Sequence, residues 1–122
     1  MIVLSGADLV LPDRLISPGT IVIDGDRIVD VLAGALPRDG AVFFDLSQRY
    51  VVPGFIDVHV HGVGGADVLD EDDGAVARVA ERLPRYGVTA FCPTTIACRP
   101  DALRAMLAAV RRARTTRPAG GA

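Results

Sequence analysis

The sequence predicts an α/β protein in two parts, a small β domain in residues 1–52 and a domain of alternating strands and helices in residues 53–122. Three observations support this prediction. Short β-rich runs, separated by Pro and Gly turns and without a helical pattern, fill the first part. A strand-like run, a helical run, a second strand-like run and a second helical run follow. Both histidines of the chain lie at the end of the first of these later strands.

The first part is predicted to be a small antiparallel sheet layer belonging to a β-sandwich. Strands are expected at residues 2–4, 7–11, 20–32, 41–45 and 50–52, with a Pro and Gly loop at 12–19 and a polar loop at 46–49. Asp24-Gly25-Asp26 is expected to divide residues 20–32 into the two strands of a hairpin, because Asp-Gly readily adopts a tight β-turn.

The second part begins with "FIDVHV", residues 55–60, which is apolar on both faces except at Asp57 and His59. That pattern is typical of a buried parallel strand covered by helices. The next helix is predicted at residues 75–83 and is expected to stop near Pro84 and Gly87. We assign the acidic run at residues 70–73 to capping and dipole compensation at the start of this helix.

A second strand is expected at residues 88–97 and a second helix at residues 101–114. Within that helix, four apolar residues at i, i+3, i+4 and i+7 predict one buried stripe: Leu103, Met106, Leu107 and Val110. Its arginines at 104, 111, 112 and 114 are interpreted mainly as a solvated face near the helix C-terminus.

Strands and helices in this order begin a parallel α/β layout, but two βα units cannot close a TIM-like (β/α)8 barrel. Closure takes eight strands and roughly 250 residues. If the architecture is a barrel, the chain is its front end. Residues 115–122 have a loop composition and stand where a third strand should begin.

Composition excludes several classes of protein. The chain has 122 residues, half of them apolar, which suffices for a domain with a core. A net charge of −2 gives no electrostatic footprint for nucleic acid. The first 14 residues resemble neither a signal peptide nor a membrane span, so we expect a cytoplasmic protein without a membrane partner. Cys92 and Cys98 lack zinc-knuckle or redox spacing and are predicted to be partly buried thiols.

Asp57, His59 and His61 are expected on one face of the first barrel-type strand, because side chains alternate along a strand. Two imidazoles at i and i+2 are roughly 6 to 7 Å apart at Cα and can both reach one metal ion. They also precede a loop at the carboxyl end of the strand, where ligands collect in parallel α/β folds. The alternative is two structural polar residues, since imidazole has other uses.

The loop after the histidines supports a site, because Gly62, Gly64 and Gly65 allow positive φ and close backbone approach. Two histidines are nevertheless too few. A catalytic zinc ion normally has three protein ligands plus water, so at least one more ligand must come from elsewhere.

Other site types fit the sequence poorly. "GVGGAD" lacks the spacing of a dinucleotide loop, and no Gly-Lys-Ser/Thr follows as in a P-loop. The acidic run "DVLDEDDG" resembles a calcium loop only superficially, because Leu69 and Ala80 fall where ligand carboxylates belong.

The run "DLSQRYVVPGFIDVHVHG" resembles the opening signature of the amidohydrolase superfamily, in which a small β domain precedes a metal-bearing (β/α)8 barrel. Among the families of this superfamily, the stretches "HVHGVGGADVLD" and "GVTAFCPTTIA" resemble the N-acetylglucosamine-6-phosphate deacetylases more than the dihydroorotases, hydantoinases or N-acyl-D-amino-acid deacylases. One departure is Gln48, where a glycine is common; it puts a local turn in doubt, not the site.

The resemblance implies that His59 and His61 are metal ligands, with Asp57 a possible supporting residue behind them. It implies one or two divalent ions (Zn, Fe, Mn or similar), a small amino-sugar phosphate substrate and a homodimeric full-length parent. The reaction would release acetate and glucosamine 6-phosphate, as part of amino-sugar and carbohydrate metabolism. The catalytic Asp, further ligands and phosphate-binding groups would lie beyond Ala122, so this chain alone is expected to be inactive.

Three hypotheses follow. The first is the N-terminal part of such a deacetylase, whose coding sequence would continue into the family's next metal motif, His-x-Glu-Gly-Pro. The second is a non-catalytic remnant or interaction module of 122 residues. Its open strand edges and helix faces would be an aggregation risk, which favours the first. The third is another amidohydrolase, such as an N-acyl-amino-acid deacylase or a dihydroorotase-like enzyme.

Overall fold

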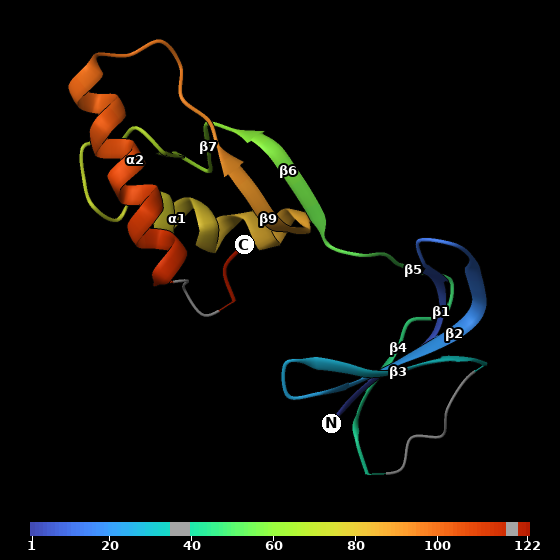
Figure 1. Ribbon diagram of the computed structural model, residues 1–122. Helices are drawn as coiled ribbons and strands as arrows, with labels where there is room; N and C mark the ends of the chain where they lie inside the picture. The colour runs from blue at the N-terminus through green and yellow to red at the C-terminus, as the bar shows by residue number, and fades with distance from the viewer. Residues whose placement is uncertain (35–39, 117–119) are drawn as a thin grey trace. The chain divides into compact units, whose positions relative to one another are not determined.

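The computed structural model describes residues 1–34, 40–116 and 120–122 (Figure 1). Its contacts divide the chain into two compact units, Met1–Pro53 and Gly54–Ala122. Part of the predicted terminal loop, residues 117–119, lies outside the described residues. No described helix is long and apolar enough to cross a membrane.

The first unit is a five-stranded sheet. Its strands are β1 (Ile2–Val10), β2 (Leu15–Asp24), β3 (Arg27–Ala33), β4 (Val42–Asp45) and β5 (Tyr50–Val51). The order is β3-β2-β1-β4. The short strand β5 also pairs with β1, at Asp8 and Leu9, which follow the stretch of β1 that pairs with β4. The predicted hairpin is confirmed: β2 and β3 are antiparallel, and Gly25 in the turn between them has φ 58°.

The prediction of an antiparallel sheet is wrong for two strands, because β4 and β5 both run parallel to β1. After β3 the chain continues to the opposite edge of β1, and a strand that arrives there by such a crossover runs parallel to its neighbour. Within residues 1–34 and 40–53 these five strands form one sheet, so the unit is a single sheet layer.

The Pro and Gly loop predicted at residues 12–19 is also wrong, because β2 already begins at Leu15. Leu15 and Ile16 pair with the end of β1, and pairing resumes at Gly19. The register shift between these pairs leaves Pro18 outside the ladder, where its missing N–H costs no strand hydrogen bond.

Alternate side chains of β1 form the core of this unit. Ala7 and Leu9 are buried with Ile21 of β2, as the period of two along a strand requires. Ser5 and Thr20 are buried polar residues whose hydroxyl oxygens are 3.0 Å apart. The Thr20 hydroxyl also donates to the carbonyl of Gly34, so this buried polar pair is satisfied.

The second unit has the predicted order of strand, helix, strand and helix. Its elements are β6 (Phe55–Val60), β7 (Gly62–Val63), β8 (Ala66–Asp67), α1 (Ala75–Arg82), the 3-10 helix η1 (Leu83–Tyr86), β9 (Val88–Pro93) and α2 (Pro100–Thr115). β6 and β9 pair in parallel, and Figure 1 shows α1 and α2 on one side of that pair. Gly87, in the left-handed conformation at φ 77°, ends η1 where the sequence predicts the stop.

The core of this unit joins the strand pair to both helices. Its buried members are Val60, Ala66, Val68, Val79, Leu83, Val88 and Met106. The predicted stripe of α2 is wrong in part, because Leu103 is 38% exposed and Leu107 48% exposed. At 100° per residue, the buried face of α2 centres between Met106 and Ala109, so Leu103 lies about 90° away at its margin and Leu107 about 130° away, outside it.

The prediction that β6 is buried on both faces is wrong. Phe55, Ile56 and Val58 are 59%, 70% and 72% exposed, and Val60 alone among its residues is buried. Among the described residues β6 pairs only with β9, and the helices cover one face of the two strands. The apolar side chains of β6 are therefore largely exposed on both of its faces, and its other edge is unpaired among the described residues.

Two smaller predictions are corrected. Cys92 and Cys98 are exposed rather than partly buried. The acidic run does not cap α1, whose N-cap is Gly74 without a side-chain hydrogen bond. Instead, Asp72 accepts hydrogen bonds from the Gly74 N–H and from Arg78, and the Arg78 guanidinium lowers the pKa of Asp72 below its ordinary value. The acids therefore tie the loop to α1 through an arginine within the helix.

Candidate metal centre

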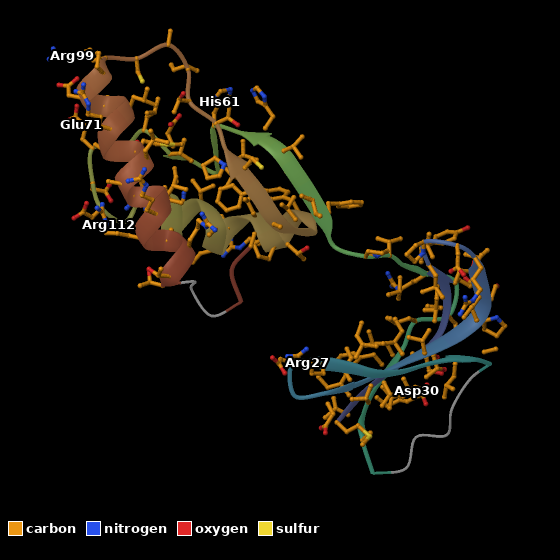
Figure 2. All side chains as sticks on the ribbon, in the orientation of Figure 1. Arg27, Asp30, His61, Glu71, Arg99 and Arg112 are labelled. Carbon is orange, nitrogen blue, oxygen red and sulfur yellow. The ribbon has the colours of Figure 1, made fainter. Side chains whose placement is uncertain are left out.

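The imidazole pair lies at the carboxyl end of β6, the end where parallel strands present functional groups. β6 ends at Val60, and His61 is the next residue. Figure 2 labels His61 at this end of the strand. The residue that follows β9 holds this end in place, because the Thr94 N–H donates to the Val60 carbonyl at 2.7 Å. The main chain around the histidines is thus fixed from β9.

The two rings contact each other through the same nitrogen. His59 Nε2 and His61 Nε2 are 3.1 Å apart, and the rings meet edge to face with centroids 4.9 Å apart. His61 Nδ1 is 2.9 Å from the Thr94 carbonyl oxygen. Because a carbonyl only accepts, Nδ1 carries the hydrogen and His61 Nε2 offers its lone pair.

This geometry is compatible with a shared divalent ion. Two imidazole nitrogens 3.1 Å apart could both reach one ion, since metal–nitrogen bonds are about 2.0–2.1 Å long. A backbone carbonyl on the far nitrogen of a ligating imidazole is also a common arrangement in metal sites, because it fixes the tautomer and the ring orientation.

Asp57 touches the main chain of the site rather than an imidazole. Its Oδ1 accepts the His59 N–H at 3.0 Å. The strand register shifts between Asp57 and Val60, so this carboxylate binds an N–H within an irregular stretch of the ladder. Asp57 thereby fixes the backbone that carries His59.

The glycine loop is a small hairpin that sequence reasoning missed. β7 and β8 pair through Gly62↔Asp67 and Val63↔Ala66, around a turn formed by Gly64 and Gly65 with φ of 58° and 82°. Positive φ at both turn residues is what a tight hairpin turn requires, and the Gly-Gly pair was the available signal. At Gly62 a Cβ would lie 2.1 Å from the Ala66 carbonyl oxygen, so no larger residue fits there.

Four of the predicted site residues line one cavity, whereas Gly64 and Gly65 form the hairpin turn and are not among its lining residues. A cavity of about 400 Å³ is lined by Asp57, His59, Val60, His61, Gly62, Val63, Leu83, Tyr86 and Val88. Within residues 1–34, 40–116 and 120–122, no group of three or more His, Cys, Asp or Glu side chains is placed to hold an ion.

Two further contacts were not predicted. The first is the Thr94 carbonyl on His61, which no sequence pattern could signal because every residue has a carbonyl. The second is Arg82 of α1, whose Nη1 donates to the Gly64 carbonyl at 2.7 Å. An arginine in the last turn of a helix is already explained by the helix dipole. The sequence therefore offered no reason to expect a contact between Arg82 and the hairpin.

Fold and geometry together define the class, an α/β protein with paired imidazoles at the carboxyl end of a parallel strand. The chain belongs to the amidohydrolase family, whose model matches residues 50–117. Members of this family are generally metal-dependent, which agrees with the donor set found here.

Curated relatives are similar over about half to two thirds of the chain. The N-acetylglucosamine-6-phosphate deacetylase of Rattus norvegicus is 44% identical over 66 residues, which is 52% of this chain and 16% of that protein. The N-acetylgalactosamine-6-phosphate deacetylase of Escherichia coli O157:H7 is 30% identical over 81 residues, 66% of this chain and 22% of that protein. The chain thus spans about a sixth to a fifth of the length of these relatives.

A solved structure is similar over almost the whole chain. It is a variant of the N-acetyl-D-glucosamine-6-phosphate deacetylase of Mycobacterium smegmatis in complex with N-acetyl-D-glucosamine-6-phosphate. The TM-score is 0.79 at 30% identity, covering 93% of this chain and 30% of that one. Similarity of this extent supports a common fold for both units.

Proposed function

We propose that this chain is the N-terminal part of a metal-dependent deacetylase that removes the acetyl group from N-acetylglucosamine 6-phosphate, giving glucosamine 6-phosphate and acetate. The observation that carries the proposal is the imidazole pair, with both Nε2 atoms 3.1 Å apart and His61 held by Thr94. The similarity of the chain to N-acetylglucosamine-6-phosphate deacetylases supports the choice of substrate.

In this proposal β6 with α1 and β9 with α2 are the first two βα units of a (β/α)8 barrel, and the sheet of residues 1–53 is one layer of the small β-sandwich domain. The parallel pairing of β6 and β9 supports the barrel assignment. The exposed apolar side chains and the unpaired edge of β6 support it too, since a strand so apolar is normally covered.

His59 and His61 would hold the divalent ion, and Asp57 would keep the His59 backbone in place. When bound, the ion supplies an activated water and a polarised amide carbonyl. The Thr94 carbonyl keeps the hydrogen of His61 on Nδ1, so that Nε2 stays free to coordinate. Gly62, Gly64 and Gly65 belong to the hairpin that directly follows His61 in the chain.

No residue of this chain is proposed to move the proton of the reaction. The resemblance places the catalytic Asp, further ligands and the phosphate-binding groups outside residues 1–122. The whole protein is proposed to be a cytoplasmic homodimer.

A second substrate is favoured by one observation. The E. coli relative is named for N-acetylgalactosamine 6-phosphate, which differs from the first substrate at one sugar hydroxyl. Both reactions hydrolyse the same amide, and the residues that read the sugar are proposed to lie outside this chain.

The metal proposal is tested by titrating the protein with Zn²⁺, beside His59→Ala and His61→Ala. We expect each variant to lose at least tenfold in affinity, because each removes one ligand. Equal affinity in all three proteins would refute the ligand assignment. As a matched control, Cys98→Ala removes an exposed potential ligand outside the cavity and should leave the affinity unchanged.

The substrate proposal is tested by acetate release from both N-acetylhexosamine 6-phosphates, using the protein as expressed from its gene. A reading frame that continues beyond codon 122 into His-x-Glu-Gly-Pro supports the assignment to a longer enzyme. A genuine stop at that codon, with no continuing frame, would refute it.

A further inference from the structure

Arg82 reaches from α1 to the loop that follows the imidazole pair. Its Nη1 donates to the Gly64 carbonyl at 2.7 Å and lies 3.5 Å from the Val63 carbonyl. In the described part of the chain no carboxylate lies within ion-pair distance of this guanidinium. A charged donor at 2.7 Å from a carbonyl makes a strong hydrogen bond, so the tip of the hairpin is firmly held.

The β7–β8 hairpin needs such an anchor because it is too short to be stable by itself. It has two residue pairs, and even long isolated hairpins are only marginally stable in water. Three anchors hold it: Arg82 at the tip, the buried Ala66 and Val68 beneath, and the hydrogen bond from the Val68 N–H to the His61 carbonyl at the base.

The hairpin is coupled to the imidazoles through its base. His61 is the residue immediately before β7, and its own carbonyl accepts the Val68 N–H at 2.9 Å. The hairpin residues Gly62 and Val63 also line the cavity beside both imidazoles. Displacement of the hairpin would therefore move the His61 backbone and one wall of the cavity together.

The helix dipole does not explain this contact by itself. A cation in the last turn of α1 is favoured whatever it touches, as Arg85 nearby in η1 illustrates by remaining exposed. Arg82 instead is half-buried and extends across to the hairpin turn, where its side chain lies 3.6 Å from the position of a Gly64 Cβ.

We propose that Arg82 is a positioning residue, which clamps the β7–β8 hairpin and thereby fixes the geometry of His61 for metal binding. This proposal rests on the metal-binding role of His59 and His61 proposed above. It predicts that loss of the clamp weakens and distorts the metal site without removing a ligand, an effect typical of residues behind the ligands.

The test measures Co²⁺ binding and the visible absorption of the bound ion in the expressed protein, with Arg82→Ala, Arg82→Lys and Arg85→Ala. We expect Arg82→Ala to raise the Kd for Co²⁺ about tenfold or more and to change the spectrum, within the range for residues behind metal ligands. Arg82→Lys keeps one cationic donor and should recover part of the affinity. Arg85→Ala should match the wild type.

Amide hydrogen exchange at Val68 gives a direct readout, because this N–H binds the His61 carbonyl and should exchange faster once the clamp is lost. Gly62→Ala should reproduce both effects, since its Cβ would collide with the Ala66 carbonyl while Arg82 stays intact. This variant and Arg82→Lys keep the test decisive if Arg82→Ala does not fold.

The outcomes separate the two proposals. If the wild type binds no Co²⁺, the proposed metal function is overturned. If the wild type binds Co²⁺ while folded Arg82 variants keep the same Kd and spectrum, the positioning role alone is overturned. Affinity that falls equally in Arg85→Ala would also overturn it, because the effect would then come from charge and not from the clamp.

Discussion

Replacement of Gln48 by glycine should stabilise the first unit. Gln48 has φ 62°, the left-handed conformation, and is the only non-glycine residue with positive φ among the described residues. It is the third residue of a turn closed by the hydrogen bond from the Arg49 N–H to the Leu46 carbonyl. A turn with positive φ at that position favours glycine, because a Cβ there crowds the backbone.

The magnitude follows from two opposing effects. A side chain in the left-handed conformation costs roughly 1–2 kcal/mol, which glycine relieves. Glycine also gives the unfolded chain more freedom, which opposes folding by about 0.4–1 kcal/mol. The Gln48 side chain is exposed, so its removal costs little packing. We expect a net gain of about 0.5–1 kcal/mol in the free energy of unfolding.

Urea unfolding followed by circular dichroism measures this gain. With a slope of about 1–2 kcal/mol per molar urea, the midpoint should rise by roughly 0.3–1 M. Gln48→Ala is the matched control, because it shortens the side chain but keeps Cβ, and it should leave the midpoint nearly unchanged. A glycine variant no more stable than the alanine variant would refute the argument from backbone strain.

Two further predictions concern the second unit. Arg78→Gln should raise the pKa of Asp72 toward its ordinary value of 3.8, since Arg78 is the main cause of its lowering. Carboxyl NMR titration measures this change. The pKa of Asp101 is the control and should stay unchanged, because its own partner Arg99 remains. Because the folded pKa of Asp72 is lowered, its contribution to the free energy of unfolding is complete above pH 3.8 and is lost as the pH falls through the folded pKa. In Arg78→Gln this loss of stability at acid pH should be smaller. Leu83→Ala should destabilise this unit by roughly 2–4 kcal/mol in urea unfolding, since Leu83 is 4% exposed and leaves a cavity. Leu107→Ala, at 48% exposure, should cost less than about 1 kcal/mol, and equal losses in the two variants would contradict the observed core.

The exposed apolar side chains of β6 show where sequence patterns stop being sufficient. Phe55, Ile56 and Val58 have the composition of a covered strand, and that composition led to the prediction of burial. Burial depends on what else is present to cover the strand, and the described residues provide β9 and two helices on one side only. A local pattern reports what a strand is suited to, not what packs on it.

Several features were determined by the sequence itself. Alternation along a strand placed His59 and His61 on one face, and the strand and helix order of residues 55–114 follows from local periodicity. Gly25 and Gly87 ended elements where predicted, because their positive φ is a local property of glycine.

Other features were decided only by the tertiary structure. The parallel pairing of β4 and β5 with β1, the contact of Thr94 with His61, and the clamp of Arg82 on Gly64 all join residues far apart in the sequence. Each depends on a backbone carbonyl or a strand edge, and every residue offers these equally. The sequence therefore determined which side chains could bind a metal ion, whereas long-range backbone contacts decided how those side chains are held.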